Sequence, residues 1–221
     1  FRIILELPME TKKRMIEGKK IIAVGGGKGG VGKSVVACNL AVGFAREGTD
    51  VVLVDADPGA PTLHTLMGIA RPGGSLGDLL SDSKVHLADV LTETRVPGLR
   101  MACGAAPILG VANPEFAKKQ RLIRELSRLD AEVLVVDIGA GVSYNVVDFF
   151  NAADLRLVVV TPQITSMHNA YGFVKSSLHR LLQRAIAGRQ GYRELFSGGG
   201  WSEEKMDQLL ERVADFDPRY L

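Results

Sequence analysis

Between Gly25 and Ser34 the sequence is GGGKGGVGKS, ten residues that hold six glycines, two lysines and one serine. Residues 27–34 fit the spacing G-x-x-x-x-G-K-[ST], in which glycines let successive backbone N–H groups approach phosphate oxygens. In this chemistry Lys33 reaches the β- and γ-phosphates, and the hydroxyl of Ser34 is a ligand of Mg²⁺. The spacing therefore predicts a site for the phosphates of a nucleotide.

Three carboxylates follow two later apolar runs. Asp55 and Asp57 end the run VVLVDAD, and residues two apart in an extended segment point to the same side. Asp137 ends a second run, EVLVVD, and is followed by Gly139 and Gly141. A single aspartate at a strand end is more often a cap or turn residue. Phosphoryl transfer requires charge neutralisation and an oriented water, so three such residues after a phosphate loop predict nucleotide hydrolysis with Mg²⁺.

The elements that must position these side chains follow a regular alternation. Four short runs rich in Val, Ile and Leu predict strands buried on both faces, over residues 20–26, 50–57, 131–141 and 155–162. Helical spacing covers residues 33–48, 114–130, 169–188 and 202–214. The alternation predicts an α/β fold, doubly wound and mainly parallel, with helices on both faces and ligands at the carboxyl ends of the strands.

Two of these helices have predicted apolar faces. The helix over 114–130 has basic residues opposite its apolar face, which consists of Phe116, Leu122, Ile123, Leu126 and Leu129. In the helix over 169–188 the predicted face is Tyr171, Val174, Leu178 and Leu181. A set of basic residues accompanies this second helix, as either a solvated face or a DNA- or lipid-facing stripe: Lys175, His179, Arg180, Arg184, Arg189 and Arg193.

The composition is typical of a globular protein. Of 221 residues, 46% are hydrophobic and 24% charged, and a net charge of +2 argues neither for nor against nucleic acid. Cys38 and Cys103 form no C-x-x-C pair, which favours a reducing cytosol over a disulfide framework. No apolar run reaches the roughly 18 residues of a membrane span. We expect an N-terminal extension over residues 1–18 and a nucleotide-binding domain over 19–221.

The stretch KGGVGKS, from Lys28 to Ser34, resembles the deviant Walker A motif K-G-G-x-x-K-[ST] of the MinD/ParA family of P-loop ATPases. The resemblance implies that Lys28 reaches across a dimer interface to the partner's nucleotide, so that ATP joins two copies of the chain; the alternative is a solvated loop lysine. Lys28, Lys33 and Asp57 would then be catalytic, with Asp57 positioning the attacking water. The implied residues for ATP or ADP are Gly27, Lys28, Gly29, Gly30, Val31, Gly32, Lys33, Ser34 and Val35. Those implied for Mg²⁺ are Ser34, Asp55 and Asp137, the last through water.

The resemblance extends over roughly residues 19–185 and is strongest to the FlhG-type branch, the MinD-like flagellar-number regulators. The segments that carry it are GGGKGGVGKS, DADPGAPTLHTLMGI, GLRMACGA, VVDIGAGVSYNVVDFF and TPQITSMHNAYGFVK. Pro58 departs from that branch and matches the DADP of the ParA partition branch. In the family, further strands follow, one with an asparagine that recognises adenine, and many members end in an amphipathic membrane-binding helix. Neither pattern is visible here, so we expect the domain to lack its last strands and C-terminal helix.

The resemblance implies a cytoplasmic, slow, Mg²⁺-dependent ATPase that dimerises on ATP and regulates the placement or number of flagella or another polar machine. Its implied partners are an activator or effector protein and the inner membrane at the cell pole. Two alternatives stay open: a ParA-like partition ATPase that binds DNA non-specifically as an ATP dimer, and an iron–sulfur carrier of the Mrp type that holds its cluster through Cys103. Asn169 and Tyr171 either line the dimer face or have core or cap roles.

Overall fold

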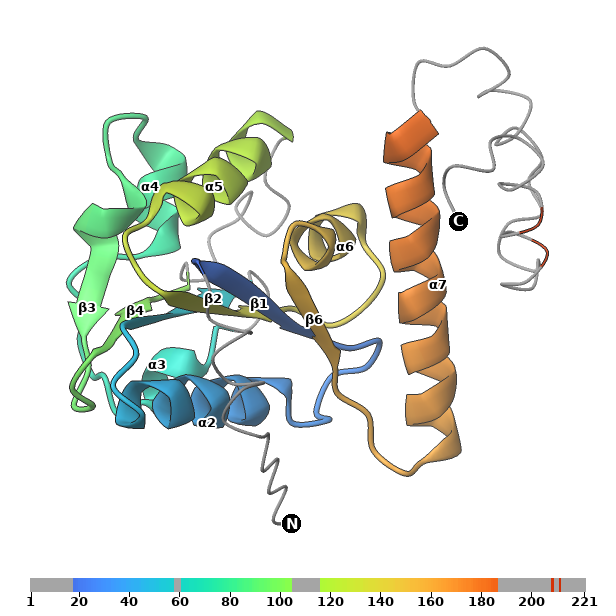
Figure 1. Cartoon of the computed structure of the whole chain (residues 1–221), viewed down its shortest axis with the longest axis horizontal. Coiled ribbons are helices and arrows are strands. Elements are labelled where there is room, and N and C mark those ends of the chain that lie inside the picture. Colours follow the sequence, from blue (N-terminus) through green and yellow to red (C-terminus); the bar gives the residue numbers. More distant parts are fainter. Residues whose placement is uncertain (1–17, 58–60, 105–115, 187–207, 209–210, 212–221) are drawn as a thin grey trace.

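The computed structural model describes residues 18–57, 61–104 and 116–186, together with Gln208 and Glu211. Within these residues the sheet has the strand order β3-β4-β2-β5-β1-β6 (Figure 1). The strands are β1 (Lys20–Gly25), β2 (Val51–Ala56), β3 (Leu91–Glu93), β4 (Leu99–Ala102), β5 (Val133–Ile138) and β6 (Leu155–Val158). All neighbouring strands pair in parallel except β3 and β4, which are antiparallel. The predicted mainly parallel α/β sheet is confirmed.

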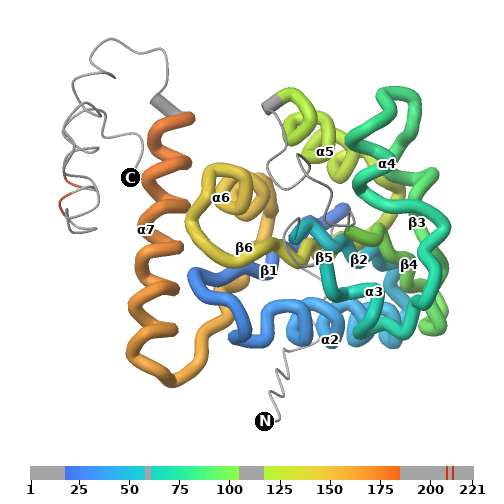
Figure 2. Tube along the Cα trace, turned by 180° about the vertical axis from the view of Figure 1, so that it is seen from behind, coloured from blue at the N-terminus to red at the C-terminus, as the bar shows by residue number. Residues whose placement is uncertain are grey.

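Helices cover both faces of this sheet (Figure 2). One face carries α2 (Lys33–Arg46) and α3 (Leu63–Leu66); the other carries α4 (Leu76–Ser81), α5 (Phe116–Arg128) and α6 (Tyr144–Asn151). A short 3₁₀ helix, η1 (Leu87–Val90), follows α4, and the long helix α7 (Ile164–Ile186) stands beside α6 past the β6 edge. No helix among the described residues is long and apolar enough to cross a membrane.

The central strands are buried on both faces because their residues alternate between two cores. In β2, Val52 and Val54 join the core under α4, α5 and α6, whereas Val51 and Leu53 join the core over α2. Every residue of β2 and β5 is buried. This explains why the sequence shows continuous apolar runs here instead of the polar–apolar alternation of a half-exposed strand.

The predicted faces of two helices need correction. Leu122 and Leu126 of α5, and Leu129 directly after it, are buried as predicted. The expectation that its basic residues lie opposite is wrong for Lys119, which is only 4% exposed because its ammonium donates to the carboxylate of Asp148 in α6.

In α7 the predicted apolar face is wrong for Tyr171 and Val174, which are 50% and 41% exposed. The helix also begins at Ile164, before the predicted start. Its packed face instead uses Ala170 and Phe173. The small side chain of Ala170 lets α7 approach its neighbours closely. Phe173 packs against α6, and the centroid of its ring lies 4.8 Å from that of the Phe150 ring.

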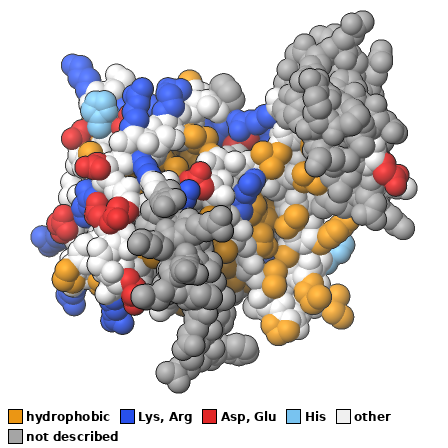
Figure 3. Space-filling model, in the orientation of Figure 1, with side chains coloured by type: hydrophobic (Ala, Val, Ile, Leu, Met, Phe, Trp, Pro, Cys, Tyr) orange, Lys and Arg blue, Asp and Glu red, His pale blue; other side chains and the backbone are white. Residues whose placement is uncertain are grey.

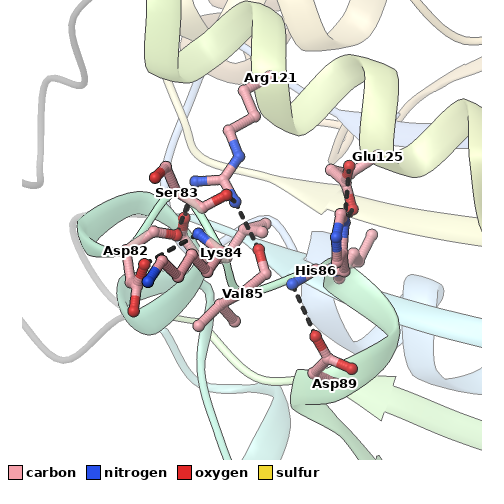
Figure 4. Close-up of polar contacts among 10 residues, drawn as sticks. Asp82, Ser83, Lys84, Val85, His86, Asp89, Arg121 and Glu125 are labelled. Carbon is pink, nitrogen blue, oxygen red and sulfur yellow. Dashed lines mark hydrogen bonds and ion pairs between the residues drawn. The ribbon is translucent and has the colours of Figure 1, made fainter.

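Arg121 of α5 fixes the turn that follows α4 (Figure 4). Its guanidinium donates to the backbone carbonyls of Leu79, Asp82, Ser83 and Val85. The last carbonyls of a helix have no N–H donor inside the helix, so the Arg121 guanidinium supplies donors at the end of α4. One turn further along α5, Glu125 accepts from the backbone N–H of Leu87 at 3.0 Å and thereby fixes the start of η1.

The predicted extension over 1–18 falls almost entirely outside the described residues, and so does the predicted helix over 202–214 apart from Gln208 and Glu211. The domain limits therefore stay predictions.

Candidate functional site

The glycine-rich loop joins the carboxyl end of β1 to the first turn of α2. Gly30 and Gly32 have φ angles of +76° and +96°, a left-handed conformation that favours glycine. Gly32 is the N-cap of α2, and no side chain caps this helix. Its first N–H groups therefore face the loop, with the positive end of the helix dipole behind them.

Two distant segments hold the loop in place. After β5, the N–H of Gly141 donates to the carbonyl of Gly26 at 3.4 Å. On α7, the backbone of Asn169 lies so close to Gly27 that a Cβ there would stand 1.9 Å from the Asn169 oxygen. Glycine at position 27 is therefore required by close packing as well as by the phosphate-loop pattern.

The two lysines of the loop lie in different environments. Lys33 is 8% exposed, and its Nζ lies 3.5 Å from the carbonyl oxygen of Lys28, so its side chain folds back over the loop. Lys28 is exposed, and its Nζ lies 3.4 Å from Oγ1 of Thr165 in the first turn of α7. One ammonium thus faces the interior of the loop and the other faces solvent beside α7.

The three predicted carboxylates meet at the carboxyl ends of β2 and β5. Asp55 and Asp137 are register partners on these neighbouring strands and are 1% and 2% exposed. Asp57 lies beside Gly139, where a Cβ would stand 3.1 Å from its Oδ1. The parallel register is what brings Asp55 and Asp137, 82 positions apart in the sequence, to one edge of the sheet.

Burial shifts both buried carboxylates away from their usual ionisation. It raises the pKa of Asp55 to about 7, although the N–H groups of Leu63 and Asp57 donate to this carboxylate and oppose the shift. It also raises the pKa of Asp137 to about 6, against a hydrogen bond from Ser34 and the nearby charge of Lys33. Two acidic groups that repel each other in a buried position would be stabilised by an added cation.

The donor set fits a hard cation such as Mg²⁺. Asp137 Oδ1 is buried and has no hydrogen-bond partner among the described residues, and its carboxylate lies next to the hydroxyl of Ser34. Oxygen donors of this kind suit Mg²⁺, which keeps several waters and takes only one or two protein ligands directly. No group of three or more His, Cys, Asp or Glu in the described part of the chain is placed so that it could hold a metal ion.

Sequence reasoning missed two hydroxyls beside the loop. Thr62 Oγ1 lies 3.5 Å from the hydroxyl of Ser34, and Thr165 is next to Lys28. Thr62 stands in the segment between β2 and α3, where its spacing from Asp55 and Asp57 offered the only signal. Asn169, left open between a dimer-face and a core role, packs against Gly27 through its backbone.

Two alternatives that the sequence left open, a cluster ligand at Cys103 and a DNA- or lipid-facing stripe on α7, find no support in the structure. Cys103 is 1% exposed and Cys38 is 8% exposed, and burial raises the pKa of each thiol to about 11, which disfavours the thiolate that a cluster requires. In the basic set of α7, Arg180 and Arg184 both pair with Asp148, although their side chains stay 22% and 36% exposed. Arg189 and Arg193 lie outside the described residues.

Comparison with known proteins agrees with this arrangement. The antiactivator FleN of Pseudomonas aeruginosa is 32% identical over 211 residues, which cover 91% of this chain and 72% of FleN. The flagellum site-determining protein YlxH of Helicobacter pylori is 32% identical over 190 residues, covering 80% of this chain and 63% of YlxH. The septum site-determining protein MinD from Pyrococcus horikoshii, solved with Mg-ADP, shares the fold with a TM-score of 0.63 at 22% identity, covering 79% of this chain and 73% of MinD.

The family model CbiA, described as the CobQ/CobB/MinD/ParA nucleotide binding domain, matches residues 22–219. This range includes the phosphate loop, the three carboxylates and α7. The chain therefore belongs to the CobQ/CobB/MinD/ParA family of nucleotide-binding domains, and its relatives include flagellar regulators of the FlhG type.

Proposed function

We propose that this chain binds ATP with Mg²⁺ at the loop between β1 and α2, hydrolyses it slowly, and acts as a switch that dimerises while ATP is bound. The observation that carries the proposal is the convergence of Lys33 and Ser34 with the buried carboxylates Asp55 and Asp137 at one edge of the sheet. A buried lysine and an uncapped helix N-terminus can bind phosphate. A pair of buried carboxylates without enough positive charge nearby can bind the cation that accompanies it.

Each residue of the site has a role in this proposal. The backbone N–H groups of residues 27–35 and the ammonium of Lys33 hold the phosphates, and Ser34 with Asp55 and Asp137 holds Mg²⁺, the carboxylates through water. Bound Mg²⁺ supplies charge neutralisation for the phosphate oxygens. Asp57 is less buried than Asp55 and Asp137, and in this proposal it orients the attacking water.

The dimer is supported by an apolar rim around the loop. Most of the exposed large hydrophobic side chains in the described residues come from segments that follow the carboxyl ends of β1, β2, β5 and β6. These rim residues are Val35, Val36, Leu66, Val142, Tyr144, Val160, Ile164, Met167, Tyr171 and Val174. Apolar surface gathered around a polar site marks an interaction face. Lys28 is exposed beside the first turn of α7, and in this proposal it reaches the nucleotide of a second copy.

We further propose a role in the placement or number of flagella, with an activator or effector protein as partner and action at the inner membrane or cell pole. The names of FleN, an antiactivator, and YlxH, a flagellum site-determining protein, support this role. The paired state of Arg180 and Arg184 gives DNA binding through α7 less support.

The first test uses Asp57→Ala, which should retain ATP, and measures mass by light scattering with and without ATP and Mg²⁺. We expect a monomer that doubles in mass only when both are present. Adding Lys28→Ala should abolish the doubling and leave ADP binding to the monomer. A mass that ATP does not change, in a protein that binds the nucleotide, would refute the switch. The same mass measurement with GTP tests the choice of base.

A further inference from the structure

Thr62 holds its hydroxyl beside the serine at the end of the phosphate loop. It is the N-cap residue of α3, and its Oγ1 lies 3.5 Å from Oγ of Ser34. Ser34 is in turn hydrogen-bonded to the carboxylate of Asp137. Thr62 is exposed, so a ligand at the loop can reach its hydroxyl. Three segments of the chain thus each bring a side-chain oxygen to the same edge of the sheet.

The hydroxyl of Thr62 does not cap its own helix. A threonine at an N-cap ordinarily accepts a hydrogen bond from a backbone N–H of the first helical turn. In α3 the side chain of Thr62 makes no such bond. The N–H of Leu63, the first of the helix, donates instead to Oδ2 of Asp55 at 3.0 Å. Because Asp55 serves the start of α3, the Thr62 hydroxyl is directed to a contact outside the helix.

Packing fixes the backbone on both sides of Thr62. Leu63 is fully buried in the core over α2. On the other side Pro61 lies against the segment that follows β4, where a Cβ on Gly104 would stand 2.5 Å from the Pro61 Cβ. A residue held between two packed neighbours is preorganised, so little ordering cost opposes any bond that its hydroxyl makes to a ligand.

The α7 side of the loop is less suited to a cation. Figure 3 shows hydrophobic side chains gathered along α7, and those exposed in its first turns are Ile164 and Met167. The hydroxyl of Thr165 lies 3.4 Å from the Nζ of Lys28, and a bound cation there would be repelled by the ammonium. An ion beside Ser34 therefore finds a further oxygen on the α3 side, at Thr62.

We propose that Thr62 is a positioning residue for the Mg²⁺ of the nucleotide site, and that its hydroxyl hydrogen-bonds to a water of the ion beside Ser34. Two neighbouring ligands at about 2.1 Å from an octahedral ion are about 3 Å apart. The two hydroxyl oxygens are 3.5 Å apart, which favours a contact through water over direct ligation by Thr62. The inference rests on the proposed Mg²⁺–nucleotide site and adds the group that connects this site to α3.

The experiment measures how tightly Mg²⁺ binds together with ADP in the variant Thr62→Val. Valine keeps the branched shape of threonine and removes the hydroxyl. The affinity of a fluorescent ADP analogue is measured at a series of Mg²⁺ concentrations and in EDTA. We expect about ten times more Mg²⁺ to be needed for half of its effect, because groups that hold a metal's ligands set its affinity. The affinity in EDTA should stay within about twofold of the parent's, since the hydroxyl acts through the ion.

Two variants are matched controls. Thr62→Ser keeps the hydroxyl and should restore the Mg²⁺ dependence of the parent protein. Thr65→Val removes a hydroxyl from the same helix at another exposed position, where Oγ1 lies 3.2 Å from Nε2 of His64. It should leave the Mg²⁺ dependence unchanged.

The outcomes separate this inference from the proposed function. If Mg²⁺ tightens ADP binding equally in the parent protein and in Thr62→Val, the inference is overturned and the nucleotide site stands. Equal losses in Thr62→Val and Thr62→Ser, or a weakened affinity of Thr62→Val in EDTA, would also overturn it, because both indicate altered packing instead of a missing hydroxyl. If Mg²⁺ has no effect on ADP binding in the parent protein, the proposed Mg²⁺ site fails and the inference fails with it.

A spectroscopic measurement checks the same contact without comparing affinities. Mn²⁺ shares the preference of Mg²⁺ for oxygen ligands, so it can replace Mg²⁺ in the ADP complex. The EPR line shape of the bound Mn²⁺ should differ between Thr62→Val and the parent protein, and Thr62→Ser should restore it. The same line shape in all three proteins would overturn the inference.

Discussion

Replacing Asp148 with asparagine should destabilise the protein far more than most surface changes. Asp148 is fully buried in α6 and accepts hydrogen bonds from Lys119 of α5 and from Arg180 of α7, whose Nε lies 2.8 Å away. A second nitrogen of Arg180 lies 3.3 Å from the carboxylate, and Arg184 adds a fourth contact at 3.4 Å. One carboxylate thus joins three helices, and its removal takes the counter-charge from all three cations.

The magnitude follows from the burial of the cations. The side chains of Arg180 and Arg184 are 22% and 36% exposed, so they can turn toward water, and each exposed pair is worth about 0–1 kcal/mol. Lys119 is 4% exposed and cannot turn in the same way. Removing one member of a buried pair costs about 3–5 kcal/mol, so we expect a loss of about 4 kcal/mol for Asp148→Asn. Because total stability is typically about 5–15 kcal/mol, this loss is easy to measure.

Urea unfolding at pH 7 measures this loss, and Lys119→Met is the informative comparison. That variant leaves Asp148 with both arginines, so it should cost less than half as much. Burial raises the pKa of Asp148, but the hydrogen bonds from Arg180 and Lys119 outweigh it and hold that pKa below its usual 3.8. The unfolded chain therefore takes up the proton first, and the stabilisation should fade as the pH drops below 3.8. A loss below about 1 kcal/mol at pH 7, or equal losses for both variants, would refute the reasoning, given the buried-pair range.

Two further predictions concern the site. Asp55 has a pKa of about 7 in the folded protein against 3.8 unfolded, so the folded state holds its proton longer and stability in EDTA should fall as the pH rises from 4 to 7. In Asp55→Asn this fall in stability with pH should be smaller, so the variant should have a higher Tm than the parent protein at pH 8. The same dependence of Tm on pH in both proteins would contradict the prediction. Gly27→Ala should lower the Tm of the nucleotide-free protein, because its Cβ would clash with Asn169. Gly29→Ala is the control, since a Cβ there meets nothing within 4 Å, and equal Tm values would contradict the packing argument.

The parts of the fold that could be predicted from sequence depend on local signals. The phosphate loop is defined by residue types at fixed spacing, and the strands around it are continuous apolar runs that end in Gly or Asp. Asp55 and Asp137 could be placed at one edge because parallel strands end together. Predicting these features does not require knowing which helices pack on the faces of the sheet.

What could not be predicted depends on tertiary packing. The helix α6 is only eight residues long, about two turns, which is too short for a helical period to be distinguished from the run VVDFF at its centre. In α7 the buried face was missed because small side chains, Ser166, Ala170 and Ser177, pack against neighbours beside Phe173, while Tyr171 and Val174 stay exposed. Lys119 was placed on the solvent side because its partner Asp148 is 29 residues further along the chain.

The position of β1 in the sheet has a consequence for how the protein is made. Val24 pairs with Asp137 on one side and with Leu157 on the other, so the strand that leads into the phosphate loop has neighbours more than a hundred residues away. During synthesis the loop leaves the ribosome long before these neighbours exist, and loop-closure entropy must be overcome before their contacts form. Nucleotide therefore cannot stabilise the early nascent chain. Because Asn169 of α7 packs against Gly27, the glycine-rich segment reaches its packed form only after α7 has been translated.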